Sequence, residues 1–381
     1  MKKMIIVLTA FIGLSIPISA DNVVITGIST AMPDKAIAEI IRFEGNLGET
    51  IATDTVTDGN FKVTLHTDSS LNKLGLYIRK DNKSSRGRRL YVRPGAKIEI
   101  IGEDEHVDTW KVKSNVPEQA EYDKYLMESK DILDSLHQID IEYDRKRKTA
   151  IDEATVSKVK EEYTATKSLR DSLYNITLLR DLELMKSSEV TEVWLDKMEA
   201  IASICGSQTN NSICQSIKEL YGGLSDSIKT SKQGLKIKSL LYPPKKIEKG
   251  DWFPTTQFRD LMGEVHTMQE LRGKWVVAVF WSAGCGGCHY AFQELPKLLS
   301  KHPESIAGVL LSCDSDKWWR WATENFAVKG NNWNEGMEDY GLYKSFGNEG
   351  LPTVVMVTPE GRIADIFIGF YEDRIEDNLR K

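Results

Sequence analysis

Residues 275–296 read WVVAVFWSAGCGGCHYAFQELP, and this stretch decides the fold of the C-terminal part of the chain. Residues 275–281 are all apolar and rich in β-branched and aromatic side chains, which predicts a buried strand. A turn of small residues follows, and a helical pattern begins near Cys288. The sequence therefore predicts a strand, a turn and a helix, with Cys285 and Cys288 at the start of the helix.

The spacing of Cys285 and Cys288 is typical of a redox-active dithiol. Two cysteines separated by two residues can close a small disulfide ring, and a helix N-terminus favours negative charge. We therefore expect Cys285 to be a nucleophilic thiolate of low pKa and Cys288 to be the resolving thiol. Three interpretations stay open at this point: a dithiol oxidoreductase, a haem attached through Cys285, Cys288 and His289, or a structural cysteine pair.

Length and charge limit the remaining possibilities. The chain has 381 residues, more than one ordinary core holds, so we expect two or three domains. Residues 1–20 combine two lysines, an apolar run and a final Ala20, which predicts a secretory signal peptide cleaved near Ala20 and a periplasmic location, with membrane association left open. Cleavage removes two lysines and no acid, so the net charge changes from −6 to −8. An acidic chain without a basic cluster is not expected to bind nucleic acid.

Residues 21–113 predict a β-sandwich, because short alternating stretches are separated by glycine-containing turns. The pattern of Gly27, Asp58-Gly59-Asn60-Phe61 and Arg93-Pro94-Gly95 resembles the small all-β domain that precedes thioredoxin-like domains in many exported bacterial proteins. A basic loop at residues 86–89 is expected to be a solvated hairpin end.

Residues 114–242 predict an α-helical segment. Apolar stripes over residues 122–139 and 159–179 predict two long amphipathic helices packed as a hairpin, with a partner-binding coiled coil as the alternative. Shorter helices are predicted near residues 190–204, 211–221 and 225–241. Cys205 and Cys214 flank the loop between the first two of these.

In an oxidising compartment Cys205 and Cys214 are expected to form a structural disulfide, with two free thiols as the alternative. Metal binding is not expected there, because no histidine or second cysteine pair lies nearby.

Pro243-Pro244 marks a linker, after which residues 243–381 have an α/β pattern. This segment resembles the exported thioredoxin-like thiol–disulfide oxidoreductases of the TlpA/ResA type, which act in cytochrome maturation. Besides the cysteine pair, the resemblance rests on Gly250-Asp251-Trp252-Phe253-Pro254, Leu271-Arg272-Gly273-Lys274, Gly350-Leu351-Pro352-Thr353 and Pro359-Glu360-Gly361.

The resemblance implies a thioredoxin fold and a set of roles for matching residues. Cys285 would form a mixed disulfide with a substrate, and Cys288 would resolve it. Pro352 would follow a cis peptide bond and face the dithiol, leaving the Leu351 backbone to pair with an extended substrate segment. Trp281 would pack under the active-site turn. The only redox group implied is the Cys285–Cys288 disulfide itself, with no metal and no other cofactor.

This chain departs from the family at several positions. Gly284 stands where a tryptophan is common, so the mouth of the site should be less apolar. Val279 and Ala291 stand where related proteins carry the acids that accept protons near the resolving cysteine. Glu294 and His289 are the candidates to replace those acids, and both can equally be ordinary helix-surface residues.

We expect a reductant of protein disulfides in the periplasm, with protein disulfides or dithiols as substrates and a membrane thiol donor as partner. The alternatives are a disulfide oxidase or isomerase, and a partner-binding protein with a vestigial dithiol. A peroxidase of the same superfamily is not expected, because the chain has no lone cysteine preceded by the threonine and proline of that class. Cys313 is expected to be a small buried hydrophobe, and the tryptophans of residues 318–321 either core or a contact patch.

Overall fold

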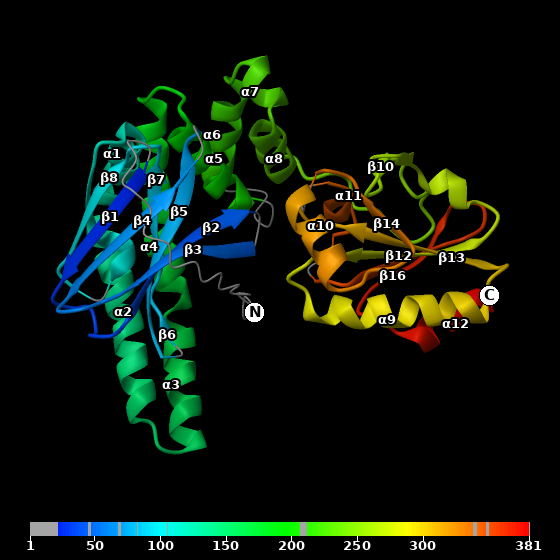
Figure 1. The fold of residues 1–381 in the computed structure, drawn as a ribbon, viewed down its shortest axis with the longest axis horizontal. Coiled ribbons are helices and arrows are strands. Elements are labelled where there is room, and N and C mark those ends of the chain that lie inside the picture. Colours follow the sequence, from blue (N-terminus) through cyan, green and yellow to red (C-terminus); the bar gives the residue numbers. More distant parts are fainter. Residues whose placement is uncertain are drawn as a thin grey trace. The chain divides into compact units, whose positions relative to one another are not determined.

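The computed structural model describes residues 22–44, 47–67, 70–81, 83–104, 106–205, 212–337, 341–347 and 350–380. The predicted signal peptide lies outside these ranges. The described chain divides into two compact units, one formed by most of residues 22–233 and the other by residues 234–380 (Figure 1). Within the described residues no helix has both the length and the hydrophobicity that crossing a bilayer requires.

The N-terminal unit begins with two β-sheets. In the first sheet β1 (Asn22–Ser29) lies between β4 (Asn60–His66), which is antiparallel to it, and β8 (Lys97–Gly102), which is parallel; β9 (Lys111–Ser114) completes the edge. The second sheet has the order β3 (Leu47–Thr55), β2 (Ile37–Glu44), β5 (Asn72–Lys80) and β6 (Lys83–Ser84), and β7 (Arg88–Val92) also pairs with β5. Buried and exposed residues alternate strictly along β4, as in a strand with one face on a core.

A short 3₁₀ helix, η1 (Val107–Thr109), precedes β9, and a helical region follows the sheets. Its helices are α1 (Pro117–Glu128), α2 (Lys130–Thr149), α3 (Glu153–Ala165), α4 (Lys167–Lys186), α5 (Glu192–Cys205), α6 (Ser212–Gly222), α7 (Asp226–Thr230) and α8 (Lys232–Leu241).

The prediction of two long helices is wrong in one respect, because each is interrupted. The first breaks at Ser129, whose φ of −113° is not helical and whose N–H bonds the Leu126 carbonyl at 3.3 Å. The second breaks at Thr166, whose hydroxyl donates to the Tyr163 carbonyl at 2.7 Å. At Thr166 the hydroxyl offers a local bond in competition with the helix ladder, whereas at Ser129 the local bond comes from the backbone N–H. The helix predicted over residues 225–241 is likewise divided, at Ser231.

The buried face of α4 also differs from the predicted stripe. Leu169 and Leu179 are 54% and 47% exposed, whereas Leu178 and Leu182 are 5% and 1% exposed. Because α4 carries apolar side chains on more than one face, hydrophobicity alone did not indicate which face packs.

Arg88 corrects the prediction of a solvated basic loop. Its side chain is 0% exposed, its Nε donates to the Trp110 carbonyl at 3.0 Å, and its guanidinium forms an ion pair with Asp123 on α1. A buried arginine needs such partners, because an unpaired buried charge is very costly. Arg88 therefore joins the second sheet to the helical region.

The C-terminal unit is built on a seven-stranded mixed sheet. Its order is β11 (Val265–His266), β10 (Phe258–Arg259), β14 (Asn331–Asn334), β13 (Ile306–Ser312), β12 (Trp275–Trp281), β15 (Thr353–Val357) and β16 (Ile363–Ile368). β12, β13 and β14 run parallel, whereas β15 and β16 form an antiparallel hairpin beside β12. The surrounding helices are η2 (Met268–Leu271), α9 (Gly286–Lys301), α10 (Asp316–Asn325), α11 (Leu342–Ser345) and α12 (Glu372–Leu379).

Strand β12 is apolar throughout because both faces of the sheet are covered. Its odd-numbered residues, such as Val279, pack with α9, α10 and α12, and its even-numbered residues, such as Phe280, pack with η2 and α11. Trp318 and Trp319 of α10 are 8% and 2% exposed, so these two tryptophans belong to the core rather than to a contact patch. The architecture confirms the predicted fold class of N-terminal β-sheets, a central helical region and a C-terminal α/β domain.

Candidate redox-active site

The paired cysteines lie where β12 passes into α9. Cys285 is the N-cap residue of α9, and its Sγ accepts a hydrogen bond from the Cys288 N–H at 3.2 Å. The first turn of a helix has N–H groups without intrahelical partners, and its dipole favours an anion. A thiolate on Cys285 is therefore stabilised by the helix, which is the condition that makes a cysteine nucleophilic at neutral pH.

The two sulfurs form a disulfide but differ in accessibility. Cys285 and Cys288 are bonded, with their Cα atoms 5.3 Å apart. Cys285 is half-buried, whereas Cys288 is 0% exposed. A substrate approaching from outside meets Cys285 first, so the geometry suits Cys285 as the attacking sulfur and Cys288 as the resolving one.

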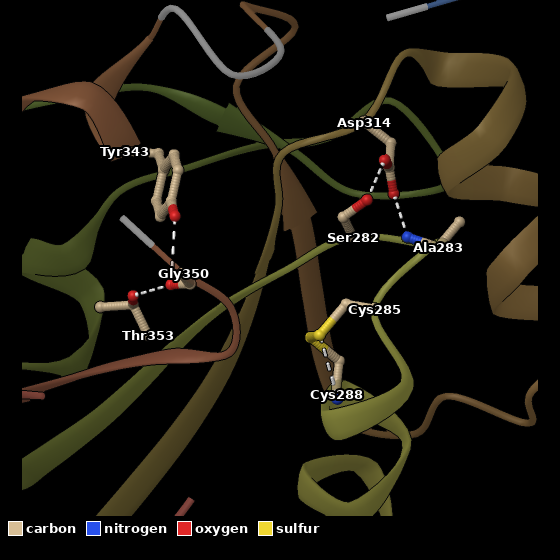
Figure 2. The surroundings of a disulfide bond; sticks show 8 residues. All are labelled: Ser282, Ala283, Cys285, Cys288, Asp314, Tyr343, Gly350 and Thr353. Carbon is tan, nitrogen blue, oxygen red and sulfur yellow. Dashed lines mark hydrogen bonds between the residues drawn. A yellow bond between two sulfur atoms is a disulfide. The ribbon is translucent and has the colours of Figure 1, made fainter. Parts of the chain in front are cut away.

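Asp314 holds the turn that carries Cys285. Its carboxylate accepts hydrogen bonds from the Ser282 hydroxyl at 2.7 Å and from the Ala283 N–H at 2.6 Å (Figure 2). Asp314 is only 7% exposed, and charge-assisted bonds of this kind are stronger than neutral ones. It reaches the turn because it follows β13, which is parallel to β12, so that both strands end at the same edge of the sheet.

The sequence pattern assigned no role to Asp314. The sequence signal that could have indicated its role is a carboxylate that closely follows the apolar run of residues 306–312. The structure adds that Cys285, Asp314 and Leu351 line one pocket.

Pro352 lies close to the dithiol turn. The Leu351–Pro352 peptide bond is cis, and a Cβ placed on Gly287 would be 3.3 Å from Pro352 Cδ. The Pro352 carbonyl accepts from the Gly369 N–H at 2.7 Å, but the backbone N–H and carbonyl of Leu351 form no hydrogen bond within the described residues. Leu351 therefore offers one free donor and one free acceptor beside the disulfide.

The loop before Pro352 is held by two hydroxyl groups. The Gly350 carbonyl accepts from the Thr353 hydroxyl at 2.7 Å and from the Tyr343 hydroxyl at 3.1 Å (Figure 2). Both hydrogen bonds are accepted by Gly350 and neither involves Leu351. They therefore position the loop and leave the backbone N–H and carbonyl of Leu351 available.

The interior beneath the dithiol is apolar. Trp281 is 0% exposed and packs edge-on against Phe292 with ring centroids 4.9 Å apart. Val279 and Ala291, the positions where related proteins carry acids, are both 0% exposed. No carboxylate replaces those acids at either position.

The two candidate proton carriers face other groups. Glu294 forms an ion pair with Lys297 at 2.8 Å. The His289 ring lies 4.0 Å from the Phe326 ring, and its Nε2 has no hydrogen-bond partner in the described structure. Neither side chain forms a hydrogen bond with Cys288 among the described residues.

The other three cysteines lie apart from this chemistry. Cys205 and Cys214 form a disulfide between α5 and α6, and residues 206–211 of the intervening loop lie outside the described residues. Cys313 is outside both disulfides and lies buried in the core on the opposite face of the sheet from Trp281.

Comparison with known proteins finds a family match within the C-terminal unit. Residues 250–366 match the model of the AhpC/TSA family. Similar solved structures include the thioredoxin domain of a thiol-disulfide oxidoreductase from Bacteroides vulgatus, at 23% identity and a TM-score of 0.32, with 35% of this chain and 97% of that chain covered. A thiol:disulfide interchange protein from a Bacteroides species has 23% identity and a TM-score of 0.32, with coverage of 35% and 89%.

A thiol-disulfide oxidoreductase from Bacteroides fragilis has 19% identity and a TM-score of 0.30, with 35% of this chain and 98% of that chain covered. The curated proteins give no match. The match to the AhpC/TSA model thus lies within the C-terminal α/β unit, which carries the Cys285–Cys288 pair.

Proposed function

We propose that the C-terminal domain is a thiol–disulfide oxidoreductase that reduces protein disulfides. The observation that carries this proposal is the unequal burial of two bonded sulfurs at a helix N-terminus: Cys285 is partly accessible and accepts the Cys288 N–H, and Cys288 is fully buried. A structural disulfide has no need of this asymmetry, whereas an exchange reaction needs one sulfur that meets the substrate and one that is shielded from it.

The reaction balances without another cofactor. The Cys285 thiolate attacks one sulfur of a substrate disulfide, so that a mixed disulfide forms and the second substrate sulfur leaves as a thiolate. The Cys288 thiol then loses its proton and attacks Cys285 Sγ, closing the Cys285–Cys288 bond and releasing the first substrate sulfur. Two electrons pass to the substrate, and its two thiolates take up protons.

The free backbone groups of Leu351 give the substrate a place to bind. An extended segment can pair with one donor and one acceptor as an added strand does, with its cysteine directed at Cys285. Such pairing reads the backbone and not the side chains, so it suits a range of protein substrates. We propose Leu351 and Pro352 as the positioning residues of the site and Trp281 as its rigid floor.

We further propose that the protein works in the periplasm and receives electrons from a thiol donor in the membrane. Support comes from the signal-like residues 1–20 and from the need to keep Cys285 and Cys288 reduced in an oxidising compartment. No nucleic-acid partner is proposed, because the net charge is −6.

Trapping tests the proposal directly. The Cys288→Ser variant should accumulate mixed disulfides on Cys285 that dithiothreitol releases, and reduced wild-type protein should reduce insulin. Cys285→Ser is the matched control and should do neither. The reduction potential decides the direction: a value near that of thioredoxin, about −270 mV, supports a reductant, and a value near about −120 mV indicates an oxidase. If Cys288→Ser traps no partner and the wild-type protein leaves insulin intact, the proposal fails.

A further inference from the structure

Three potential metal ligands meet in the N-terminal unit, far along the chain from the dithiol. His106 and Asp108 flank the start of η1, and His137 lies on α2. One potential ligand atom from each residue lies within 4.8 Å of the others. His137 Nε2 is 3.1 Å from Asp108 Oδ2, and the two imidazole rings stack with centroids 4.0 Å apart.

One member of the cluster, His137, is buried, the other two are half-buried, and their polar atoms are not all satisfied. His137 is 1% exposed. Its Nδ1 and the second carboxylate oxygen of Asp108, Oδ1, are both buried without a hydrogen-bond partner in the described structure. Buried polar atoms without partners are rare in native proteins, and an ion or a water is a common reason for them. The unpartnered Asp108 Oδ1, in the same carboxylate that contacts His137 Nε2, points to a missing ligand at this pair, whereas His137 Nδ1 is directed away from it on the ring.

A pocket gives access to the cluster. All three side chains line an open pocket of about 530 Å³ within the N-terminal unit. One face of α2 forms much of its wall, through residues three or four positions apart: His137, Asp140, Ile141, Asp144, Arg145, Lys148 and Thr149. The pocket has room for an ion together with water molecules or a small ligand.

Two of the three cationic side chains of lysine and arginine that line the pocket are paired with carboxylates. The Arg86 guanidinium acts electrostatically on Asp108, but it forms an ion pair with Asp140. Arg145 likewise pairs with Glu142 at 2.8 Å. With these cations compensated, Asp108 supplies one negative charge at the cluster.

A second His–acid cluster, formed by Asp260, Glu264 and His266, serves as a contrast. Both nitrogens of His266 already face carboxylates, at 2.9 Å from Glu270 and 3.5 Å from Asp260. Glu264 is exposed, and no side-chain atom of this set is both buried and unpartnered among the described residues. The ion pairs within this set already satisfy its imidazole, so its arrangement does not require an ion.

We propose that His106, Asp108 and His137 bind one divalent transition-metal ion of the zinc class, with a fourth coordination position open to the pocket. Two imidazole nitrogens and one carboxylate oxygen are ligands that zinc accepts, and three protein ligands with an open position are common in its sites. Binding replaces the His137–Asp108 hydrogen bond. The half-buried His106 ring must turn out of its stack, because two parallel rings cannot both direct a nitrogen at one ion.

Zinc titration of the oxidised full-length protein tests the site. Without reductant the Cys285–Cys288 and Cys205–Cys214 pairs stay in disulfides and do not compete for zinc. After removal of metal with a chelator, calorimetry should show one zinc ion per chain. Asp108→Asn and His106→Ala should each weaken binding by about tenfold or more. His266→Gln, the matched control in the contrasting cluster, should bind as the wild type does.

Thermal unfolding gives a second readout, because a ligand that binds only the folded state raises its stability. Zinc should raise the melting temperature of the wild type and of His266→Gln, and should not raise that of Asp108→Asn. These substitutions avoid the fully buried His137, and circular dichroism checks that each variant is folded. If a variant does not fold, cobalt bound to the wild type should show the visible bands of a tetrahedral site. Absence of zinc binding by the wild type, or equal binding by Asp108→Asn and His106→Ala, would overturn the proposal.

Discussion

Replacing Asp314 by asparagine should weaken both the active-site turn and the reaction. The carboxylate accepts from the Ser282 hydroxyl at 2.7 Å and from the Ala283 N–H at 2.6 Å in an environment that is 7% exposed. An asparagine has one acceptor oxygen in place of two and would direct an NH₂ group at one of these donors. Loss of one hydrogen bond to a buried charged group costs about 1.5–3 kcal/mol. We therefore expect the free energy of unfolding of the C-terminal domain to fall by about that amount.

The same change should slow disulfide reduction, because the turn that Asp314 holds also carries Cys285. A displacement of a reacting group by about 1 Å can cost up to about a hundredfold in rate, so a loss on the order of tenfold is expected for Asp314→Asn. Urea unfolding followed by tryptophan fluorescence measures the stability, and insulin reduction measures the rate.

The matched control for both assays is Asp316→Asn. The Asp316 side chain is 69% exposed and, within the described part of the chain, forms an ion pair only with the exposed Arg320, so its loss should change stability by less than about 0.5 kcal/mol. If Asp314→Asn matches Asp316→Asn in both stability and rate, the assigned role of Asp314 is wrong.

Three further measurements address other parts of the structure. Replacing Cys205 and Cys214 together by serine should lower the free energy of unfolding of the N-terminal unit by about 2–3 kcal/mol, because the disulfide closes a loop with a sequence separation of 9. Urea unfolding measures this, and a midpoint urea concentration equal to that of the wild type would refute it. Burial opposes ionisation of Asp365, but hydrogen bonds from a guanidinium and an amide lower its pKa in the folded state. The ionised carboxylate therefore stabilises the fold at pH values above the pKa of the unfolded state, and this stabilisation is lost on acidification. Asp365→Asn should thus differ most from wild type near pH 6 and converge with it in strong acid. The hydrogen bond to Glu270 raises the pKa of His266 in the folded state. The protonated ring therefore stabilises the fold fully at pH values below the pKa of the unfolded state, and this stabilisation disappears as the pH rises through the pKa of the folded state. The melting temperatures of His266→Gln and wild type should differ more at pH 6 than at pH 9, and a constant difference would contradict this.

The elements that could be predicted from the sequence are those whose pattern is local. The apolar run over residues 275–281 is a strand buried on both faces, and the spacing of Cys285 and Cys288 places two sulfurs on one helix turn. These features depend on neighbours within a few residues. Family resemblance added the cis bond before Pro352, which no propensity of a single sequence would indicate.

The features that were missed depend on contacts between distant segments. Asp314 reaches the Cys285 turn only because β12 and β13 are adjacent and parallel, and hydrophobicity does not specify which strands become neighbours. His106 and His137 lie on different elements and meet only when α2 packs beside η1. The break between α1 and α2 at Ser129 was not predicted for another reason. A single serine within a strongly periodic apolar pattern is usually tolerated in a helix.

The most direct test of the redox assignment is the relative reactivity of the three thiols in the reduced C-terminal domain of the intact protein. Brief treatment with limiting iodoacetamide at pH 7, followed by peptide mass spectrometry, gives the rate at each cysteine. Cys285 should react about tenfold faster or more than Cys288 and Cys313, because it alone combines exposure with a helix N-terminus. Equal rates at Cys285 and Cys288, or faster modification of Cys288, would contradict the assignment of Cys285 as the nucleophile.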